Sequence, residues 1–108
     1  MIIQDIIIMQ LNIESPDVPI DDRLLKLVMN NFSHIGKMYD RIVKCQVILK
    51  KVPDNHKKEF GIEACLVLPG YSLFAEDKAV TFEIALHKVI NNIIRQLRRY
   101  KSKRGEIW

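Results

Sequence analysis

Apolar residues recur at two different spacings along this chain, and the order of those spacings limits the fold more than any other feature. Four segments alternate between apolar and polar side chains, as half-buried strands do: residues 6–13, 41–52, 60–68 and 71–76. Two segments instead carry apolar residues along one side at helical spacing: residues 22–38 and 80–101. The sequence therefore predicts the element order β-α-β-β-β-α.

This order predicts an α/β (α+β) two-layer sandwich. A strand, a helix and a second strand form a right-handed crossover, so the first two strands should be parallel neighbours. Short turns at residues 54–58 and at Pro69-Gly70 should join the later strands as hairpins. Both helices then pack on one face of a four-stranded sheet. Asp21 is the expected N-cap of the first helix, and Thr81 or Asp77 that of the second.

Length and composition place the chain among globular proteins. With 108 residues, 48% of them apolar, it can bury a real core, and we expect a single domain over residues 1–108. Two cysteines are too few for a disulfide framework and indicate reduced thiols. The apolar N-terminus carries Asp5 and no basic residue, unlike a signal peptide, and no segment has the roughly 20 apolar residues of a membrane span. We expect a cytoplasmic protein with no membrane partner.

Positive charge is concentrated on the predicted helices. The net charge is only +4, yet the segment RQLRRYKSKR, residues 95–104, holds six Lys or Arg and no acid. The first helix also lacks acids between Arg23 and Met38, whereas an ordinary solvated helix mixes Glu and Lys four residues apart. The candidate binding cations are Arg23, Lys26, Lys37, Lys88, Arg95, Arg98, Arg99, Lys101, Lys103 and Arg104.

These cations have two possible explanations. Basic residues at the end of the last helix could simply complement the negative end of its dipole. That explanation does not cover the first helix, so a layer that binds phosphate is favoured. An A-form RNA surface suits it better than B-DNA, because no recognition helix is visible. The helix faces also lack aromatics on which bases could stack, so we expect recognition of the RNA backbone and shape.

The sequence offers no catalytic or metal-binding pattern. His34, His56 and His87 are scattered and lack ligand spacing with a Cys or a carboxylate. Strand parity turns Cys45 toward the core and Cys65 away from it, so a disulfide is not expected. No phosphate-binding loop, nucleophile elbow or carboxylate pair is present. We therefore predict a protein that is not an enzyme and needs no cofactor or metal.

The sheet face opposite the helices is expected to carry several apolar residues among polar ones: Ile8, Ile48, Val67 and Phe74. Such a face is either ordinary exposed surface or a contact patch through which copies of the chain weakly associate. The residues leave both alternatives open.

Three stretches, KMYDRIVKCQVILK, LPGYSLFAED and above all RQLRRYKSK, resemble the bacterial ribosome hibernation-promoting factors and ribosome-associated inhibitors, the sigma-54 modulation protein family. The similarity covers about residues 9–104, so residues 1–8 resemble an N-terminal extension and residues 102–108 a short C-terminal tail. The chain departs from the family pattern at Ile84 and Asn91-Asn92. It also resembles the short family members, which lack a second, dimer-forming domain.

The resemblance implies a function that composition cannot supply. Family members bind the small ribosomal subunit near the decoding centre, occupy the mRNA and tRNA sites and silence ribosomes in stressed or stationary cells. The best-matched contacts to ribosomal RNA are Lys37, Arg95, Arg98, Arg99 and Lys101. The alternatives are a general binder of structured RNA and a structural protein that self-associates through its open sheet face.

Overall fold

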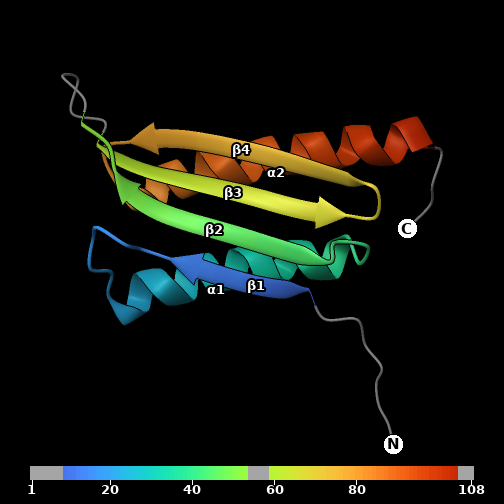
Figure 1. Ribbon diagram of the computed structural model, residues 1–108. Coiled ribbons are helices and arrows are strands. Elements are labelled where there is room, and N and C mark those ends of the chain that lie inside the picture. The colour runs from blue at the N-terminus through green and yellow to red at the C-terminus, as the bar shows by residue number, and fades with distance from the viewer. Residues whose placement is uncertain (1–8, 54–58, 105–108) are drawn as a thin grey trace, which may run out of the picture.

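The computed structural model describes residues 9–53 and 59–104, and its elements follow the predicted order. Figure 1 shows a sheet with two helices behind it. The bounds are β1 Gln10–Glu14, α1 Asp22–Met38, β2 Lys44–Lys51, β3 Phe60–Leu68, β4 Tyr71–Ala79 and α2 Phe82–Arg104. The expected β-α-β-β-β-α arrangement is confirmed.

The four strands lie in the order in which they occur in the sequence. β1 pairs with β2 in parallel, while β2–β3 and β3–β4 are antiparallel, as the crossover and the two turns predicted. Both helices cover the same face, with α1 behind β1 and β2 and α2 behind β3 and β4 (Figure 1). No helix of residues 9–53 or 59–104 covers the other face of the sheet, and we call that face the open face.

Strand register brings the helix-facing side chains into one core. Cys45 on β2 lies opposite Leu66 on β3, and Leu66 lies opposite Leu73 on β4. Val28 and Phe32 of α1, both at 0% exposure, belong to the same buried cluster as these strand residues. The predicted apolar stripe of α2 is buried at Phe82, Ala85, Leu86, Val89, Ile93, Leu97 and Tyr100. This shared core fixes the outward direction of the other helix residues.

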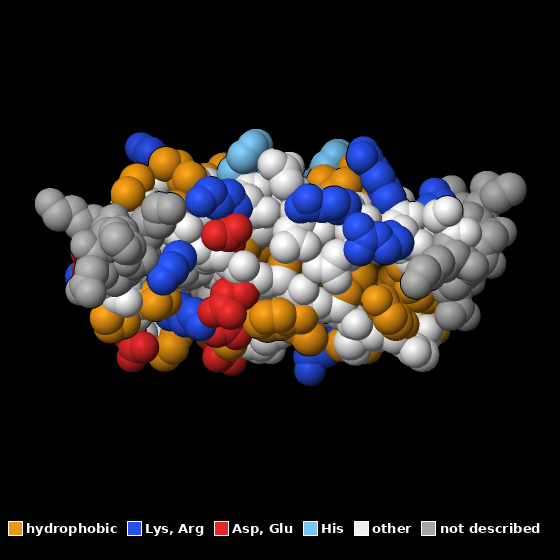
Figure 2. All heavy atoms as spheres, turned by 90° about the horizontal axis from the view of Figure 1, so that it is seen from above, with side chains coloured by type: hydrophobic (Ala, Val, Ile, Leu, Met, Phe, Trp, Pro, Cys, Tyr) orange, Lys and Arg blue, Asp and Glu red, His pale blue; other side chains and the backbone are white. Residues whose placement is uncertain are grey.

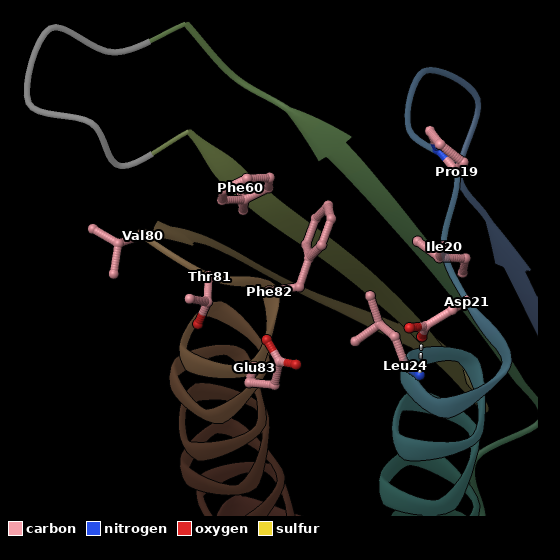
Figure 3. A pocket seen from close by; sticks show the side chains of 9 residues that line it. All are labelled: Pro19, Ile20, Asp21, Leu24, Phe60, Val80, Thr81, Phe82 and Glu83. Carbon is pink, nitrogen blue, oxygen red and sulfur yellow. Dashed lines mark hydrogen bonds between the residues drawn. The ribbon is translucent and has the colours of Figure 1, made fainter.

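The two helices run in the same direction, so their starts lie side by side (Figure 3). Asp21 caps α1 as predicted, because its Oδ1 accepts a hydrogen bond from the backbone N–H of Leu24 at 2.8 Å. Thr81 caps α2, accepting from the N–H of Ile84 at 3.2 Å. Asp77, the other expected cap, instead lies within β4 and accepts from the N–H of Lys78.

Several element ends differ from the sequence prediction, including those of β2, which spans Lys44–Lys51 and not residues 41–52. β1 spans Gln10–Glu14, one residue further than predicted at its end, while residues 6–8 of the predicted strand lie outside the described part. β4 continues to Ala79, because Asp77 and Ala79 still pair with Ile62 and Phe60 of β3. α2 continues to Arg104, where basic residues suit the negative end of the helix dipole. The predicted turn at residues 54–58 also lies outside the described residues.

Candidate nucleic-acid interface

The outer side of α1 presents three of the predicted cations. Arg23, Lys26 and Lys37 are all exposed, since the buried residues Val28 and Phe32 hold the opposite side of the helix against the sheet. The acid in the first turn, Asp22, lies at the positive end of the helix dipole. The remaining length of α1 therefore presents positive and neutral groups alone.

The outer side of α2 carries a longer series of cations. Arg95, Arg98 and Arg99 are exposed, whereas Lys88 and Lys101 are half-buried. Glu83 lies in the first turn, and no acid follows it within the helix. Lys103 and Arg104 fall within α2, but their side chains are outside the described part. The structure thus directs the described cations of both helices away from the sheet.

These helix cations lack carboxylate partners within the described part of the chain. No ion pair there involves Arg23, Lys26, Lys37, Lys88, Arg95, Arg98 or Arg99. An unpaired guanidinium or ammonium group can take up a phosphate without first losing another partner. We call these seven residues the helix cations. Their surface is suited to an extended polyanion.

The arrangement can be followed from the side of β4 and α2 (Figure 2). His34 on α1 and His87 on α2 are both exposed, and His side chains appear along the upper edge of this view, on the side of the helices. Lys and Arg side chains recur along the length of that layer, and most of the Asp and Glu side chains in view lie below it. The positive groups form a surface that runs along the helices.

The C-terminal ends of the two helices are held together by aromatic contacts. The Nζ of Lys101 on α2 lies 5.9 Å from the ring centroid of Tyr39, the C-cap of α1. Tyr100 stacks on Tyr71, with centroids 5.0 Å apart and ring planes 26° apart. The Tyr100 hydroxyl also points to the carbonyl of Pro69 at 3.5 Å. The basic end of α2 is therefore fixed to both α1 and the β3–β4 turn.

Gln96 ties α2 to the edge of the sheet. Its Nε2 donates hydrogen bonds to the backbone carbonyl of Phe74 on β4 and to Oδ1 of Asn92, both at 2.8 Å. Gln96 is half-buried at the border between the apolar stripe and the outer side of α2. The bond to an edge-strand carbonyl needed the tertiary structure, because no sequence pattern pairs residues 22 positions apart.

The open face has a different polar chemistry that the sequence analysis missed. Lys50 of β2 forms ion pairs with Glu63 of β3 and with Glu76 of β4, the latter at 2.6 Å. The Glu63 hydrogen bond, followed by that of Glu76, raises the pKa of Lys50. Asn12 donates to Gln46 across β1 and β2 at 3.1 Å. Alternation did place these residues on the open face, but only the register brought them into contact.

Apolar residues on the open face lie where strand parity predicted them. Ile48 and Val67 are half-buried, and Phe74 is 52% exposed. Ile8 is outside the described residues. Self-association through this face stays a prediction.

The two cysteines lie where strand parity predicted them. Cys45 is fully buried and Cys65 is half-buried on the other face, and both are free thiols. Burial, with the Cys65 charge as a smaller cause, raises the pKa of Cys45 to about 12. Within residues 9–53 and 59–104, no three His, Cys, Asp or Glu side chains come together as metal ligands. His56 lies outside those ranges.

A hollow of about 280 Å³ lies between the starts of the two helices (Figure 3). Its walls include Ile20, Leu24 and Phe82, and the Asp21 carboxylate at its rim is engaged in capping α1. This hollow is at the opposite end of the helices from Arg98 and Arg99. The residues that line it include no Lys or Arg, so the hollow is not part of the cationic surface.

Neither helix of the described residues combines the length and the apolar composition needed to cross a bilayer.

Residues 11–105 match the family model described as Sigma 54 modulation protein / S30EA ribosomal protein. The match includes all of α1 and α2 and therefore every helix cation. The chain belongs to this family. The resemblance of RQLRRYKSK and its neighbouring motifs is thus confirmed over nearly the whole chain.

Curated members of the Sigma 54 modulation / S30EA family are similar over most of their length. A ribosome hibernation promoting factor of Escherichia coli (strain K12) is 30% identical over 95 residues, covering 88% of this chain and 96% of that protein. One from Pseudomonas putida is 27% identical over 99 residues, covering 92% and 93%. These relatives are named for ribosome hibernation and not for a catalysed reaction.

Solved structures share the family fold at lower identity. A ribosomal subunit interface protein from Coxiella burnetii superposes with a TM-score of 0.75 at 21% identity, covering 87% of this chain and 99% of that one. The N-terminal domain of Thermus thermophilus Protein Y gives 0.70 at 17% identity, covering 85% and 99%. The α/β sandwich described above is therefore the fold of these proteins too.

Proposed function

We propose that this chain is a ribosome hibernation factor of the bacterial cytoplasm, which binds the small ribosomal subunit through its helix layer. The observation that carries this proposal is the set of helix cations, none of which has a carboxylate partner within the described chain. Family membership and relatives named as hibernation promoting factors support it. On the subunit, the layer is proposed to lie near the decoding centre.

The proposed contacts to ribosomal RNA come from both helices. Arg98, Arg99 and Lys37 have the strongest claim, because they are exposed near the C-terminal ends that aromatic contacts hold together. The further proposed contacts are Arg23, Lys26, Lys88, Arg95, Lys101, Lys103 and Arg104. Cations spread along two parallel helices fit phosphates at several points of a folded RNA better than a single small anion.

The proposed mechanism is occupation of a site. A protein in the paths of mRNA and tRNA would prevent initiation while it is bound, and would release an undamaged ribosome when it leaves. Inhibition should therefore approach completion near one protein per ribosome. Raised salt should relieve it, because phosphate contacts weaken as the counterion concentration rises.

Sedimentation with purified small subunits tests the proposal. The wild type should migrate with the subunits through a sucrose gradient, and the double variant Arg98→Glu/Arg99→Glu should stay at the top. Both side chains are exposed, so the circular dichroism spectrum and the unfolding temperature should stay close to wild type. Binding of structured RNA without migration on subunits would instead support a general RNA-binding module.

An in vitro translation titration tests the mechanism separately. Inhibition by far fewer protein molecules than ribosomes, persisting after the protein is removed, would indicate an enzyme that damages ribosomes. Inhibition that saturates near equal amounts and reverses on dilution supports occupation of a site.

A further inference from the structure

Tyr71 combines exposure with a fixed orientation. It is the first residue of β4 and follows the tight turn at Gly70, whose φ of 70° suits glycine. One face of its ring stacks on Tyr100 of α2 at 5.0 Å, yet 47% of the residue is still exposed. Tyr71 therefore presents an aromatic surface to solvent from a supported position.

The support beneath Tyr71 is well anchored. Tyr100 is only 7% exposed, and its hydroxyl points to the carbonyl of Pro69 at 3.5 Å, on the same turn that leads into Tyr71. A ring held in this way loses little side-chain freedom when a ligand stacks on it. The stack thus forms a pre-organised platform at one end of the molecule.

The platform lies beside the most cationic part of α2. Arg99 precedes Tyr100, and Arg98 is one residue further back, so both lie within about 3 Å of Tyr100 along the helix axis. Both arginines are exposed and unpaired in the described chain. Phosphate-binding groups and an open aromatic ring at the same end of α2 are the combination that single-stranded RNA requires.

The aromatic residues of the helices themselves cannot serve this purpose. Phe32, Phe82 and Tyr100 are all buried, in agreement with the expectation that the helix faces lack stacking aromatics. Phe74 is 52% exposed, but it lies on the open face, away from the helix cations. Among the exposed aromatics of the described chain, Tyr71 is the one that packs on the cationic helix.

We propose that Tyr71 is a stacking site for an unpaired nucleobase of the RNA bound by the helix layer. This inference rests on the proposed function and adds to it. The helix cations would hold the phosphate backbone of folded RNA, while Tyr71 would take a base that is not paired. Binding would then depend on both charge and the presence of a single-stranded nucleotide.

The test compares a short single-stranded RNA containing 2-aminopurine with a duplex RNA carrying the same number of phosphates. Tyr71→Leu keeps apolar packing on Tyr100 but removes the aromatic face, and Tyr71→Phe keeps both. The affinity of Tyr71→Leu for the single strand should fall about tenfold. The slope of the logarithm of the binding constant against the logarithm of the salt concentration (the salt slope) should stay unchanged. Tyr71→Phe should bind as the wild type does. Duplex affinity should be unchanged, and 2-aminopurine quenching should be lost with Tyr71→Leu alone.

Phe74→Leu is the matched control, since it removes an aromatic of similar exposure from the open face. Equal losses for single strand and duplex in Tyr71→Leu, or an equal loss in Phe74→Leu, would overturn the stacking site. Unchanged RNA affinity with weaker migration on small subunits would do so too, because it would mean a protein contact. If wild type bound the single strand through Tyr71 but did not migrate with small subunits, only the proposed function would fail.

Discussion

The helix layer and the open face of the sheet differ in whether their basic side chains form ion pairs. On the open face, Lys50 is held between Glu63 and Glu76. On the helices, exposed residues such as Arg95 and Arg98 have no ion pair among the described residues. The same class of side chain therefore links strands on one face and stays available to a partner on the other.

This difference in ion pairing arises because a residue in a sheet and a residue on a helix have different neighbours. In a sheet, the register brings distant segments together, so that Glu63 and Glu76 are directly paired residues within reach of Lys50. On a helix, neighbours come from the same segment three or four positions away. Neither helix has an acid beyond its first turn, so its cations cannot pair locally. Four predictions test this contrast.

The two cysteines should report the largest difference between the faces. A thiol with a pKa of about 12 ionises roughly a thousandfold less at pH 8 than one with the ordinary pKa of 9.0, and Cys45 is also fully buried. A thiol reagent should therefore modify Cys65 readily and Cys45 only after unfolding. Mass spectrometry should find one rapid label in native protein and two in denaturant. Two labels added at similar rates would contradict the buried position of Cys45.

Reversing one charge on each face compares them directly. Arg98→Glu and Lys44→Glu change the net charge equally, but Arg98 is a helix cation and Lys44 is an exposed residue of the sheet. Arg98→Glu should weaken RNA binding about tenfold or more at roughly 0.1 M salt, and the salt slope should fall by about 1. Lys44→Glu should have a much smaller effect. Equal losses, measured by fluorescence anisotropy, would mean that only net charge matters.

Gln96 is the point where the helix layer meets the sheet edge. Gln96→Ala removes the hydrogen bond to the Phe74 carbonyl and the bond to Asn92, which should lower the free energy of unfolding by about 1 kcal/mol. Denaturant titration measures this change. Asn91→Ala, an exposed position on the same helix, is the control and should cost less. Equal effects would argue that the bond to β4 contributes no stability.

Lys50→Met should have the smallest effect, because partly exposed ion pairs contribute about 0.2–1 kcal/mol. The pKa of Lys50 is raised in the folded state, chiefly by Glu63, so its contribution is complete below the unfolded pKa of about 10.4. That contribution should disappear as pH rises through the folded pKa. The stability gap between wild type and variant should therefore be constant near neutrality and shrink in strong alkali. RNA affinity should stay unchanged.

The fold was predictable because local patterns and chain connectivity agree. The alternating strand at residues 60–68 and the last helix each have a single apolar side, so only that side could face the core. The end of β4 was missed, because Asp77 and Lys78 interrupt the apolar pattern while β3 still offers pairing partners. Such ends depend on a neighbouring strand that the segment itself does not reveal.

The cationic surface was predictable for a related reason. Helical spacing determined which side Arg23, Lys37 and Arg98 would occupy once the apolar side was known, and the structure places all three in solvent. Their roles as RNA contacts stay a prediction. The stack of Tyr71 on Tyr100 could not be foreseen, since it joins a strand start to a helix end 29 residues away.

By itself, the sequence determined the order of the elements, the face that each one buries and the absence of acids along the helices beyond their first turns. These properties follow from spacing within a segment, which the chain carries wherever it folds. The tertiary structure decided that Lys50 would be paired, that Gln96 would reach the edge strand and that Tyr71 would rest on Tyr100. Those contacts join segments that only strand register and helix docking bring together, so patterns within a single segment cannot predict them.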